Sequence, residues 1–278
     1  MTERRNLLRS GLVLPAALAM PVAAASAQEA APGQSVIETI KRRGSLMVGL
    51  ATFVPWAMRA KDGSLIGFEV DVATKLAEDM GVKVELVPTA WDGIIPALLA
   101  GKFDAIIGGM SITPARNLTV NFTGVYAHSG LQLTASKETA PGIAAFGDLD
   151  KPDVTIAIRR GVAPATAFLQ RTLPRATVRQ FDDDSQAFQE VLNGNATAAI
   201  SSSPKPEFQT LQYPDKLYMP FKDKLVQNSE AFAVRKGDVD GLNFFGNWIL
   251  FRTQDGWLAD RHRYWFETQD WRDQVEKL

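Results

Sequence analysis

Residues 68–87 read FEVDVATKLAEDMGVKVELV and carry two hydrophobic periods, one after the other. In the first part, Val72, Leu76 and Met80 recur at the spacing of one helix face, and Gly81 ends this pattern. Val82–Val87 then alternates apolar and polar residues, as a half-buried strand does. The stretch therefore predicts a helix that is followed directly by a strand.

The same alternation of helices and strands continues on both sides of this stretch. We expect further strands at Leu46–Leu50, Phe103–Ile107, Val154–Ile158, Thr177–Phe181, Thr197–Ser201 and Glu230–Arg235. We expect further helices after Ser35 and at Ile94–Ala100, Pro164–Arg171, Ser185–Leu192, Leu242–Phe251 and Trp257–Phe266. Strands that alternate with helices predict parallel sheets with crossover helices. Because the alternation starts again after Pro141-Gly142, the sequence predicts an α/β fold with two units.

The composition excludes several classes of protein. With 278 residues, 46% of them hydrophobic, the chain can fill a core in each of two units. Its 30 basic and 31 acidic residues form no long run of one sign, so nucleic acid is not an expected partner. The absence of cysteine excludes disulfides and thiolate sites. His128 and His262 lack the spacing of metal ligands or of a catalytic triad, so we expect no metal, no cofactor and no catalytic residue.

The N-terminal residues have the pattern of a secretory signal peptide. Arg4, Arg5 and Arg9 precede the apolar run Leu12–Ala24, which ends in the small residues Ala25-Ser26-Ala27. We expect residues 1–27 to be the signal peptide and residues 28–34 to be a polar linker. The paired arginines also fit a twin-arginine signal, so both export routes stay open. The pattern predicts a periplasmic protein.

Four long strings carry a resemblance to a known family. They are GFEVDVATKLAEDMG at Gly67–Gly81, WDGIIPALLAGKFDAIIGGMSITPAR at Trp91–Arg116, VNFTGVYAHSG at Val120–Gly130 and FAVRKGD at Phe232–Asp238. Together they resemble the amino-acid-binding family of type II periplasmic solute-binding proteins, also called family 3. The resemblance covers nearly the whole mature chain, and ordered strings of this length are far more specific than a single short motif.

The resemblance implies two lobes, each a mixed, mostly parallel sheet flanked by helices, joined by two hinge strands. It places lobe one at residues 35–133 and lobe two at residues 134–228. The chain then returns to lobe one through a second hinge crossing near Gln227–Glu230, and residues 229–278 complete that lobe with the C-terminal helices. Two lobes joined in this way can rotate as rigid bodies around a ligand.

Arg116, in the string GMSITPAR at Gly109–Arg116, is the residue that the resemblance assigns to the carboxylate of the ligand. A guanidinium can donate two parallel hydrogen bonds to a carboxylate, each contributing about 1.5–3 kcal/mol. The hydroxyl of Ser111 and the carbonyl of Gly109 are implied at the same polar end. Considered without a family, Arg116 is a surface arginine at a helix start, where the helix dipole disfavours positive charge.

Two aromatic residues, Phe53 and Trp91, are implied to pack against the apolar body of the ligand and to exclude water. From the sequence alone, each would also suit a core position, as would Tyr126. In lobe two, IRRGVAPA at Ile158–Ala165 combines a strand end with a helix start, where backbone N–H groups can meet an anion. The residues implied to face the ligand there are Arg159, Val162 and Ala163.

The chain departs from the family pattern at the amino end of the ligand. Ser202 stands where relatives carry an aspartate that pairs with the α-ammonium group, and Val162 or Ala163 stands where many carry a threonine. A hydroxyl cannot neutralise a buried ammonium group. Leu50 replaces an aspartate of the glutamine-binding members, which argues against glutamine. The α-amino group of the ligand is therefore in question.

These features predict the monomeric substrate-binding component of an ABC-type uptake system, which captures an amino acid or a related small carboxylate and delivers it to an inner-membrane permease. One alternative is a ligand without an amino group, such as an organic acid. A second is a cyclohexadienyl dehydratase-like enzyme, but Gly161–Gln170 supplies no acidic or histidine side chain as general acid.

Overall fold

The computed structural model describes residues 35–276, and the predicted signal peptide and linker lie outside this range. Its main sheet has nine strands in the order β4-β1-β5-β11-β6-β9-β7-β8, with β10 paired to β6. These strands are β1 (Ser45–Leu50), β4 (Lys83–Pro88), β5 (Ala105–Ile106), β6 (Asn121–Ser136), β7 (Thr155–Arg159), β8 (Thr177–Phe181), β9 (Ala198–Ser202), β10 (Leu217–Tyr218) and β11 (Val226–Val234). A small separate sheet pairs β2 (Met58–Arg59) with β3 (Leu65–Ile66).

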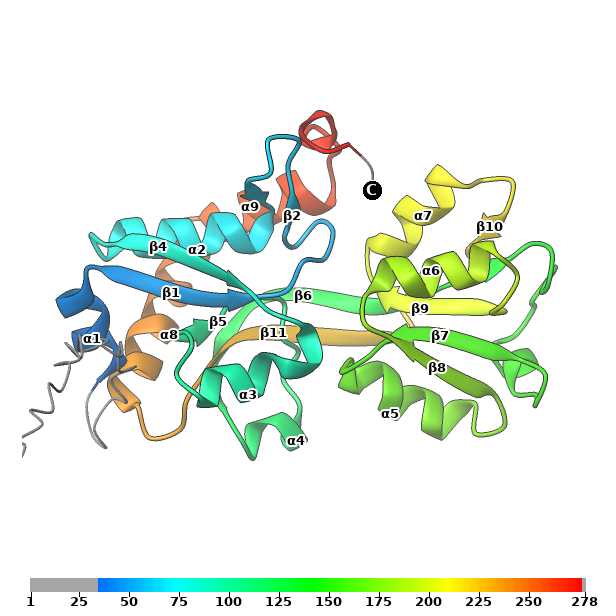
Figure 1. Cartoon of the computed structure of the whole chain (residues 1–278), viewed down its shortest axis with the longest axis horizontal. Coiled ribbons are helices and arrows are strands. Elements are labelled where there is room, and N and C mark those ends of the chain that lie inside the picture. Colours follow the sequence, from blue (N-terminus) through cyan, green and yellow to red (C-terminus); the bar gives the residue numbers. More distant parts are fainter. Residues whose placement is uncertain (1–34, 277–278) are drawn as a thin grey trace, which may run out of the picture.

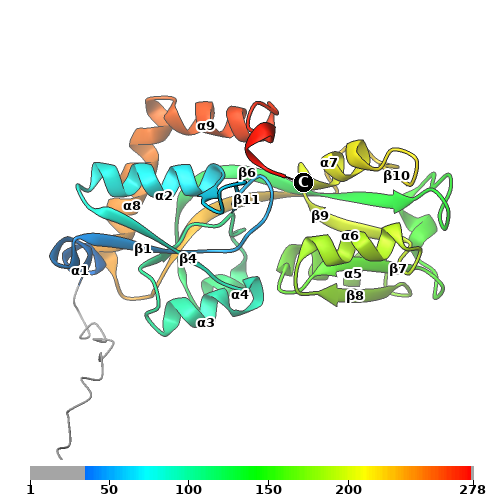
Figure 2. The ribbon, with the colours of Figure 1, turned by 45° about the horizontal axis from the view of Figure 1, so that its top comes forward.

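Helices cover the sheet in two separate groups, so the molecule has two lobes (Figures 1 and 2). We call lobe one the half that holds β1, β4 and β5, and lobe two the half that holds β7, β8 and β9. The helices of lobe one are α1 (Val36–Arg43), α2 (Phe68–Asp79), α3 (Ile94–Leu99), α4 (Pro114–Asn117), α8 (Val239–Gln254) and α9 (Trp257–Phe266). Those of lobe two are α5 (Ala163–Thr172), α6 (Asp184–Leu192) and α7 (Lys205–Gln212).

Two long strands, β6 and β11, run from one lobe into the other (Figure 1). They pair with each other in antiparallel fashion from Asn121 to Leu131 of β6. Beyond that point, Leu131–Ala135 of β6 pairs with β9 in lobe two. Within each lobe the outer strands are parallel, since β1 pairs with β4 and β5, and β7 pairs with β8 and β9. The predicted α/β fold of mixed, mostly parallel strands is confirmed.

Local sequence signals place several of these elements. The hydroxyl of Ser35 accepts a hydrogen bond of 3.2 Å from the N–H of Ile37, which caps α1 as predicted. At the other end, Gly44 has a φ of 75°, a left-handed conformation that glycine adopts without steric cost. The expected helix at Trp257–Phe266 and strand at Thr177–Phe181 have the observed bounds. The prediction missed β6 and α7, and the expected strand at Phe103–Ile107 is shorter.

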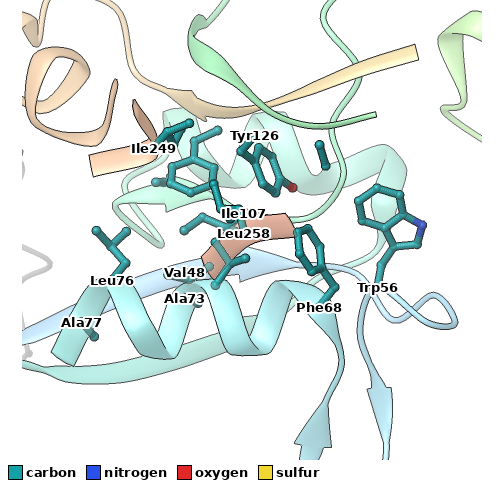
Figure 3. Close-up of a cluster of buried hydrophobic side chains, with 14 of the residues drawn as sticks. Val48, Trp56, Phe68, Ala73, Leu76, Ala77, Ile107, Tyr126, Ile249 and Leu258 are labelled. Carbon is teal, nitrogen blue, oxygen red and sulfur yellow. The ribbon is translucent and has the colours of Figure 1, made fainter. Parts of the chain in front are cut away.

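Each lobe has its own buried apolar core. In lobe one, α2 packs its apolar face against the sheet and against the returning helices α8 and α9, and Figure 3 shows Phe68, Leu76, Tyr126, Ile249 and Leu258 converging there. A second cluster in lobe two joins β6, β7, β9 and α5. Burial of one such large apolar side chain contributes about 1.5–3 kcal/mol to folding. Separate cores make each lobe a rigid support for the residues on its edge.

None of the helices in residues 35–276 is both long enough and apolar enough to cross a membrane.

Candidate functional site

A cavity lies where the two lobes face each other, with about 380 Å³ of empty space including its mouth. Its walls are formed by Phe53, Trp56, Trp91, Gly108, Gly109, Ser111, Arg116, Ser129, Arg159, Val162, Pro164 and Ser202. The structure thus brings together every residue that the sequence singled out for ligand contact, with the exception of Ala163.

Arg116 reaches the cavity from the start of α4, where Thr113 caps the helix by accepting a hydrogen bond from the N–H of Arg116. The side chain is 9% exposed. Nη1 donates 2.8 Å to the carbonyl of Ser111, and Nη2 donates 3.0 Å to the carbonyl of Gly161 in lobe two. Burial, together with the positive charge of Arg159, lowers the pKa of Arg116 to about 10. The group is therefore still a cation at neutral pH, and carbonyl dipoles are its hydrogen-bond partners.

The strand end before α4 supplies the polar floor of the cavity. Gly109 has a φ of 65°, and a β-carbon there would lie 3.0 Å from the ring of Trp56, so a glycine is required by both backbone and space. Its N–H donates 3.0 Å to the hydroxyl of Tyr126. Ser111 forms an isolated bridge with Glu230 of β11. A hydrogen bond to the Tyr126 side chain of β6 and a backbone bridge to β11 thus fix the two residues expected at the polar end of a ligand.

Aromatic rings enclose the guanidinium of Arg159. Its central carbon lies 5.0 Å from the centroid of Phe53 and 5.0 Å from the centroid of Trp91, so both rings make cation–π contacts with it. The central carbon of Arg116 lies 5.7 Å from the same Trp91 centroid. Phe53 and Trp91 therefore line the cavity as expected, but the space between them already holds a cation of the protein itself.

The carboxylate of Asp184 lies near two cations of lobe two, Arg159 and Lys205. Nε of Arg159 lies 3.3 Å from Oδ2 of Asp184, and both side chains are less than a tenth exposed. That nitrogen is buried and makes no hydrogen bond. The hydroxyl of Ser201 donates 2.6 Å to the other oxygen of Asp184. Burial lowers the pKa of Lys205, while the negative charges of Asp184 and Asp183 oppose this shift. Asp184 thus compensates only part of the positive charge around it.

The turn after β7 forms the lobe-two wall of the cavity. Val162 and Pro164 line it, whereas the N–H of Ala163 donates 3.0 Å to the carbonyl of Gly161 within the turn. The expected backbone donor at Ala163 is therefore in use locally. Ser202 lies at the end of β9, paired in register with Leu131, and its side chain lines the cavity.

Four lining residues were missed from the sequence, namely Trp56, Gly108, Ser129 and Pro164. Trp56 belongs to the same ATFVPW string as Phe53, and that proximity was the available signal. Ser129 lies in β6, which the sequence did not predict as a strand. Leu50, by contrast, is fully buried in the core and does not line the cavity.

Tyr126, His128 and His262 do not line the cavity. Tyr126 is buried in lobe one, as the core interpretation expected. Nδ1 of the exposed His128 lies 3.3 Å from the hydroxyl of Ser229. His262 stacks on Phe266 at a centroid distance of 4.3 Å, and burial lowers its pKa. Within residues 35–276, no group of His, Asp and Glu is arranged to hold a metal ion.

Known proteins of similar sequence and structure include amino-acid-binding proteins and a cyclohexadienyl dehydratase. The chain is 29% identical over 241 residues to the L-cystine-binding protein TcyJ of Escherichia coli, covering 84% of this chain and 86% of that protein. It is 27% identical over 244 residues to the cyclohexadienyl dehydratase of Pseudomonas aeruginosa, covering 84% and 87%.

Among solved structures, the chain is similar to the ancestral amino acid-binding protein AncCDT-1, a precursor of cyclohexadienyl dehydratase and a cationic amino acid solute-binding protein. The TM-score is 0.75 and the identity 38%, covering 84% of this chain and 100% of the other. The model of the bacterial extracellular solute-binding proteins, family 3, matches residues 46–268. This match spans both lobes and the cavity between them, and the chain therefore belongs to the bacterial extracellular solute-binding proteins, family 3.

Proposed function

We propose that the chain is the substrate-binding component of an ABC-type uptake system, which captures a small carboxylate in the periplasm by closure of its two lobes. One observation carries the proposal. A buried arginine of lobe one, Arg116, lines the cavity and donates its second hydrogen bond across to Gly161 of lobe two. A carboxylate that replaces this carbonyl gains a bidentate partner and touches both lobes at once.

Closure follows from the same contact. A ligand shifts an equilibrium between open and closed lobes only as far as it binds the closed state more tightly. Arg116 belongs to lobe one, while Val162 and Ser202 belong to lobe two, so a molecule among them makes its full set of contacts only when the lobes are together. Delivery to an inner-membrane permease then requires reopening of the lobes. We expect a monomer for this role.

The test is calorimetric titration of the mature protein with a panel of amino acids and a panel of carboxylic acids. We expect a member of one panel to bind, and Arg116→Ala to weaken that binding by about 2–5 kcal/mol, as loss of one partner of a buried charge pair does. Arg160→Ala is the matched control, because Arg160 is half-exposed and pairs with Asp182 outside the cavity. Small-angle scattering should show a smaller radius of gyration on binding. Undiminished affinity in Arg116→Ala contradicts the proposal.

A dehydratase activity is the second candidate, because one relative is a cyclohexadienyl dehydratase. Dehydration needs a group that donates a proton to the leaving hydroxyl. The residues that line the cavity include no aspartate, glutamate or histidine. Asp184, behind Arg159, accepts a hydrogen bond from Ser201 and forms an ion pair with Arg159, so both of its oxygens already have partners within lobe two. We therefore favour binding over catalysis; formation of phenylpyruvate from prephenate by the purified protein would reverse this choice.

A further inference from the structure

We infer that the ligand carries two acidic groups and no α-ammonium group, with one acidic group bound by Arg116 and the other by Arg159. This inference rests on the proposed function and names the chemical class of its ligand: a short dicarboxylate or an equivalent dianion.

The charges around the cavity call for two negative groups. Arg116 and Arg159 both line the cavity and are less than a tenth exposed, whereas Asp184, which pairs with Arg159, does not line it. Lys205 lies outside the lining and has both Asp184 and Asp183 near it. Burial of unpaired cations costs several kcal/mol unless counter-charges compensate them. A dianion places one acidic group against each of the two arginines that line the cavity.

The geometry of Arg159 leaves its hydrogen-bond donors free for a ligand. Phe53 and Trp91 both make cation–π contacts with the guanidinium, which carries its five N–H donors in its own plane. Nε faces Asp184 at 3.3 Å, so the two Nη groups are the donors that remain for a ligand. A guanidinium can present two parallel N–H donors to a carboxylate. The rings therefore hold Arg159 in the cavity wall and leave its edge to bind an anion.

Both guanidinium groups can reach one short molecule. Their central carbons lie 5.7 and 5.0 Å from the same Trp91 centroid, so they are separated by no more than the sum of these distances. A molecule with two carboxylates joined by a few methylene groups can therefore contact both cations. The ring of Trp91 then lies alongside the methylene groups.

Amino acids with a cationic side chain are disfavoured by the same arrangement. The slot between Phe53 and Trp91 already holds the charge of Arg159, so a second cation there meets like-charge repulsion. Binding of an α-ammonium group is also disfavoured, because the residues that line the cavity include Ser202 and Ser129 but no carboxylate. This distinguishes the chain from its structural relative that binds cationic amino acids.

The carboxylates nearest the cavity already have partners. Asp182 and Asp183 lie with Arg159 around the neighbouring hollow. Asp182 forms an ion pair of 2.8 Å with Arg160, and Asp183 caps α6 by accepting 2.9 Å from the N–H of Gln186. On the hinge side, the carboxyl of Glu230 accepts a hydrogen bond from Ser129. None of the three lines the cavity itself.

The experiment compares acids of equal length that differ in one terminal group: succinate with butyrate, glutarate with pentanoate, and adipate with hexanoate, next to L-glutamate and L-lysine. Calorimetry on the wild-type protein should show one dicarboxylate bound at least about 10-fold more tightly than its monocarboxylate partner, and more tightly than either amino acid. Arg159→Leu should weaken the dicarboxylate by about 10- to 100-fold and the monocarboxylate by much less. Arg160→Leu removes an equal charge from the next position and should leave both unchanged.

A second variant covers the case in which Arg159→Leu does not fold. Ser202→Asp leaves the Arg159–Asp184 pair intact and adds a carboxylate to the wall, so it should weaken dicarboxylates and strengthen L-glutamate. Equal binding of dicarboxylates and monocarboxylates, or tighter binding of L-lysine, overturns the inference while the proposed function stands. If the wild-type protein binds no member of the panel, or if Arg116→Ala has no effect on binding, both the inference and the proposed function are overturned.

Discussion

The hydroxyl of Tyr126 donates a hydrogen bond of 2.6 Å to Oε1 of Glu69, and both residues are buried in the core of lobe one. The same hydroxyl accepts 3.0 Å from the N–H of Gly109 at the floor of the cavity. The second oxygen of Glu69 is buried without a partner. Burial raises the pKa of Glu69 to about 8, so the carboxyl is protonated in the folded protein at neutral pH.

The stability of the protein should therefore fall as the pH rises from about 5 to 8. The ordinary pKa of this carboxyl is 4.5, so between pH 4.5 and about 8 the folded state binds a proton that the unfolded chain has released. This group lowers the free energy of unfolding by at most about 1.4 kcal/mol per pH unit. Glu69→Gln keeps an acceptor for Tyr126 and removes the titration, so its slope should be shallower in urea denaturation at several pH values.

A matched variant in the same helix controls for general charge effects. Glu78 is exposed at the end of α2, and Glu78→Gln should keep the wild-type slope. Glu230 also has a raised pKa, about 7, and it contributes to the slope that remains in Glu69→Gln. If the slope of Glu69→Gln equals that of the wild type, Glu69 is ionised in the folded protein.

Gly161 provides a test of contact between the lobes. Its φ is 80°, and a β-carbon would lie 3.2 Å from Cα of Asp92 and 3.3 Å from Cδ1 of Trp91 in lobe one. Gly161→Ala should lower stability by about 1–2 kcal/mol through backbone strain and should also weaken ligand binding, because the methyl group pushes the lobes apart. Gly142→Ala is the control, since Gly142 has a φ of 74° with open space around its β-position. Calorimetry should show weaker binding only in Gly161→Ala.

Much of the fold could be predicted because its elements have strong local patterns. The period of α2, the cap at Ser35 and the alternation of β4 are each set by residues that are close together in the sequence. Strand β6 had no such signal, because Asn121–Ser136 contains Gly124, Gly130 and several polar residues. Its strand structure depends on pairing with β11 and β9, which lie far away in the sequence. Only the tertiary fold supplies those partners.

The candidate site, too, could be predicted only in part from local sequence patterns. Arg116 and Trp91 could be selected because they belong to one long string that resembles the family pattern. The position of the Arg159 guanidinium between Phe53 and Trp91 could not be predicted, since it joins segments from both lobes. The contact of Arg159 with Asp184 likewise depends on how α6 packs beside β7. A sequence pattern identifies single residues of the site but does not reveal the charge balance among them.

The pH should also affect ligand affinity through Glu230. Its carboxyl accepts a hydrogen bond from Ser129, which lines the cavity, and burial raises its pKa to about 7. Above this pH the carboxylate is charged and repels a bound anion, so affinity should fall by about 3- to 10-fold between pH 6 and 8. Glu230→Gln should flatten this profile in calorimetric titrations. A rise in affinity with pH would mean that the bound group is a cation.

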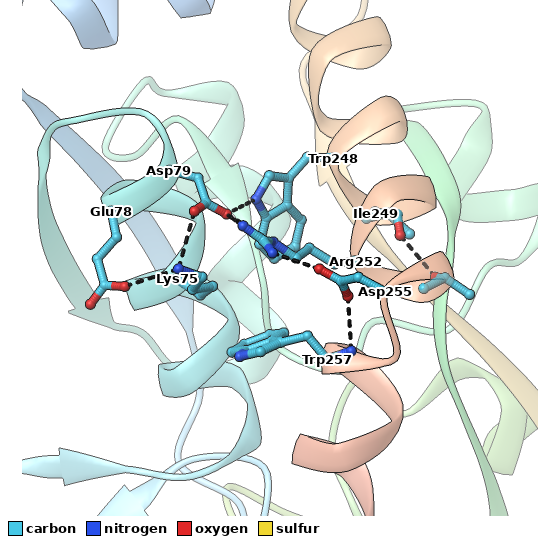
Figure 4. A network of polar contacts seen from close by, with 9 residues as sticks. Lys75, Glu78, Asp79, Trp248, Ile249, Arg252, Asp255 and Trp257 are labelled. Atoms are coloured by element: carbon cyan, nitrogen blue, oxygen red, sulfur yellow. Dashed lines mark hydrogen bonds and ion pairs between the residues drawn. The ribbon is translucent and has the colours of Figure 1, made fainter.

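Hydrogen bonds of Asp79 connect the returning helix α8 to α2. Asp79, near the end of α2, accepts 2.8 Å from Nε1 of Trp248 and 2.9 Å from Nε of Arg252, as Figure 4 shows. Asp79→Ala leaves both α8 donors without this acceptor and should lower the free energy of unfolding by about 1–3 kcal/mol. Glu78, the preceding residue, makes an exposed ion pair of 3.5 Å with Lys75, so Glu78→Ala should cost less than about 0.5 kcal/mol.

Urea denaturation of the two alanine variants measures this difference directly. Ligand affinity should be the same in both, because neither Glu78 nor Asp79 lines the cavity. Equal stability of the two variants would show that the contacts of Asp79 with α8 do not hold this helix in place. In that case the apolar packing of Trp248 against Phe232 and Trp257 carries the attachment of α8, and Trp248→Ala becomes the variant that loosens it.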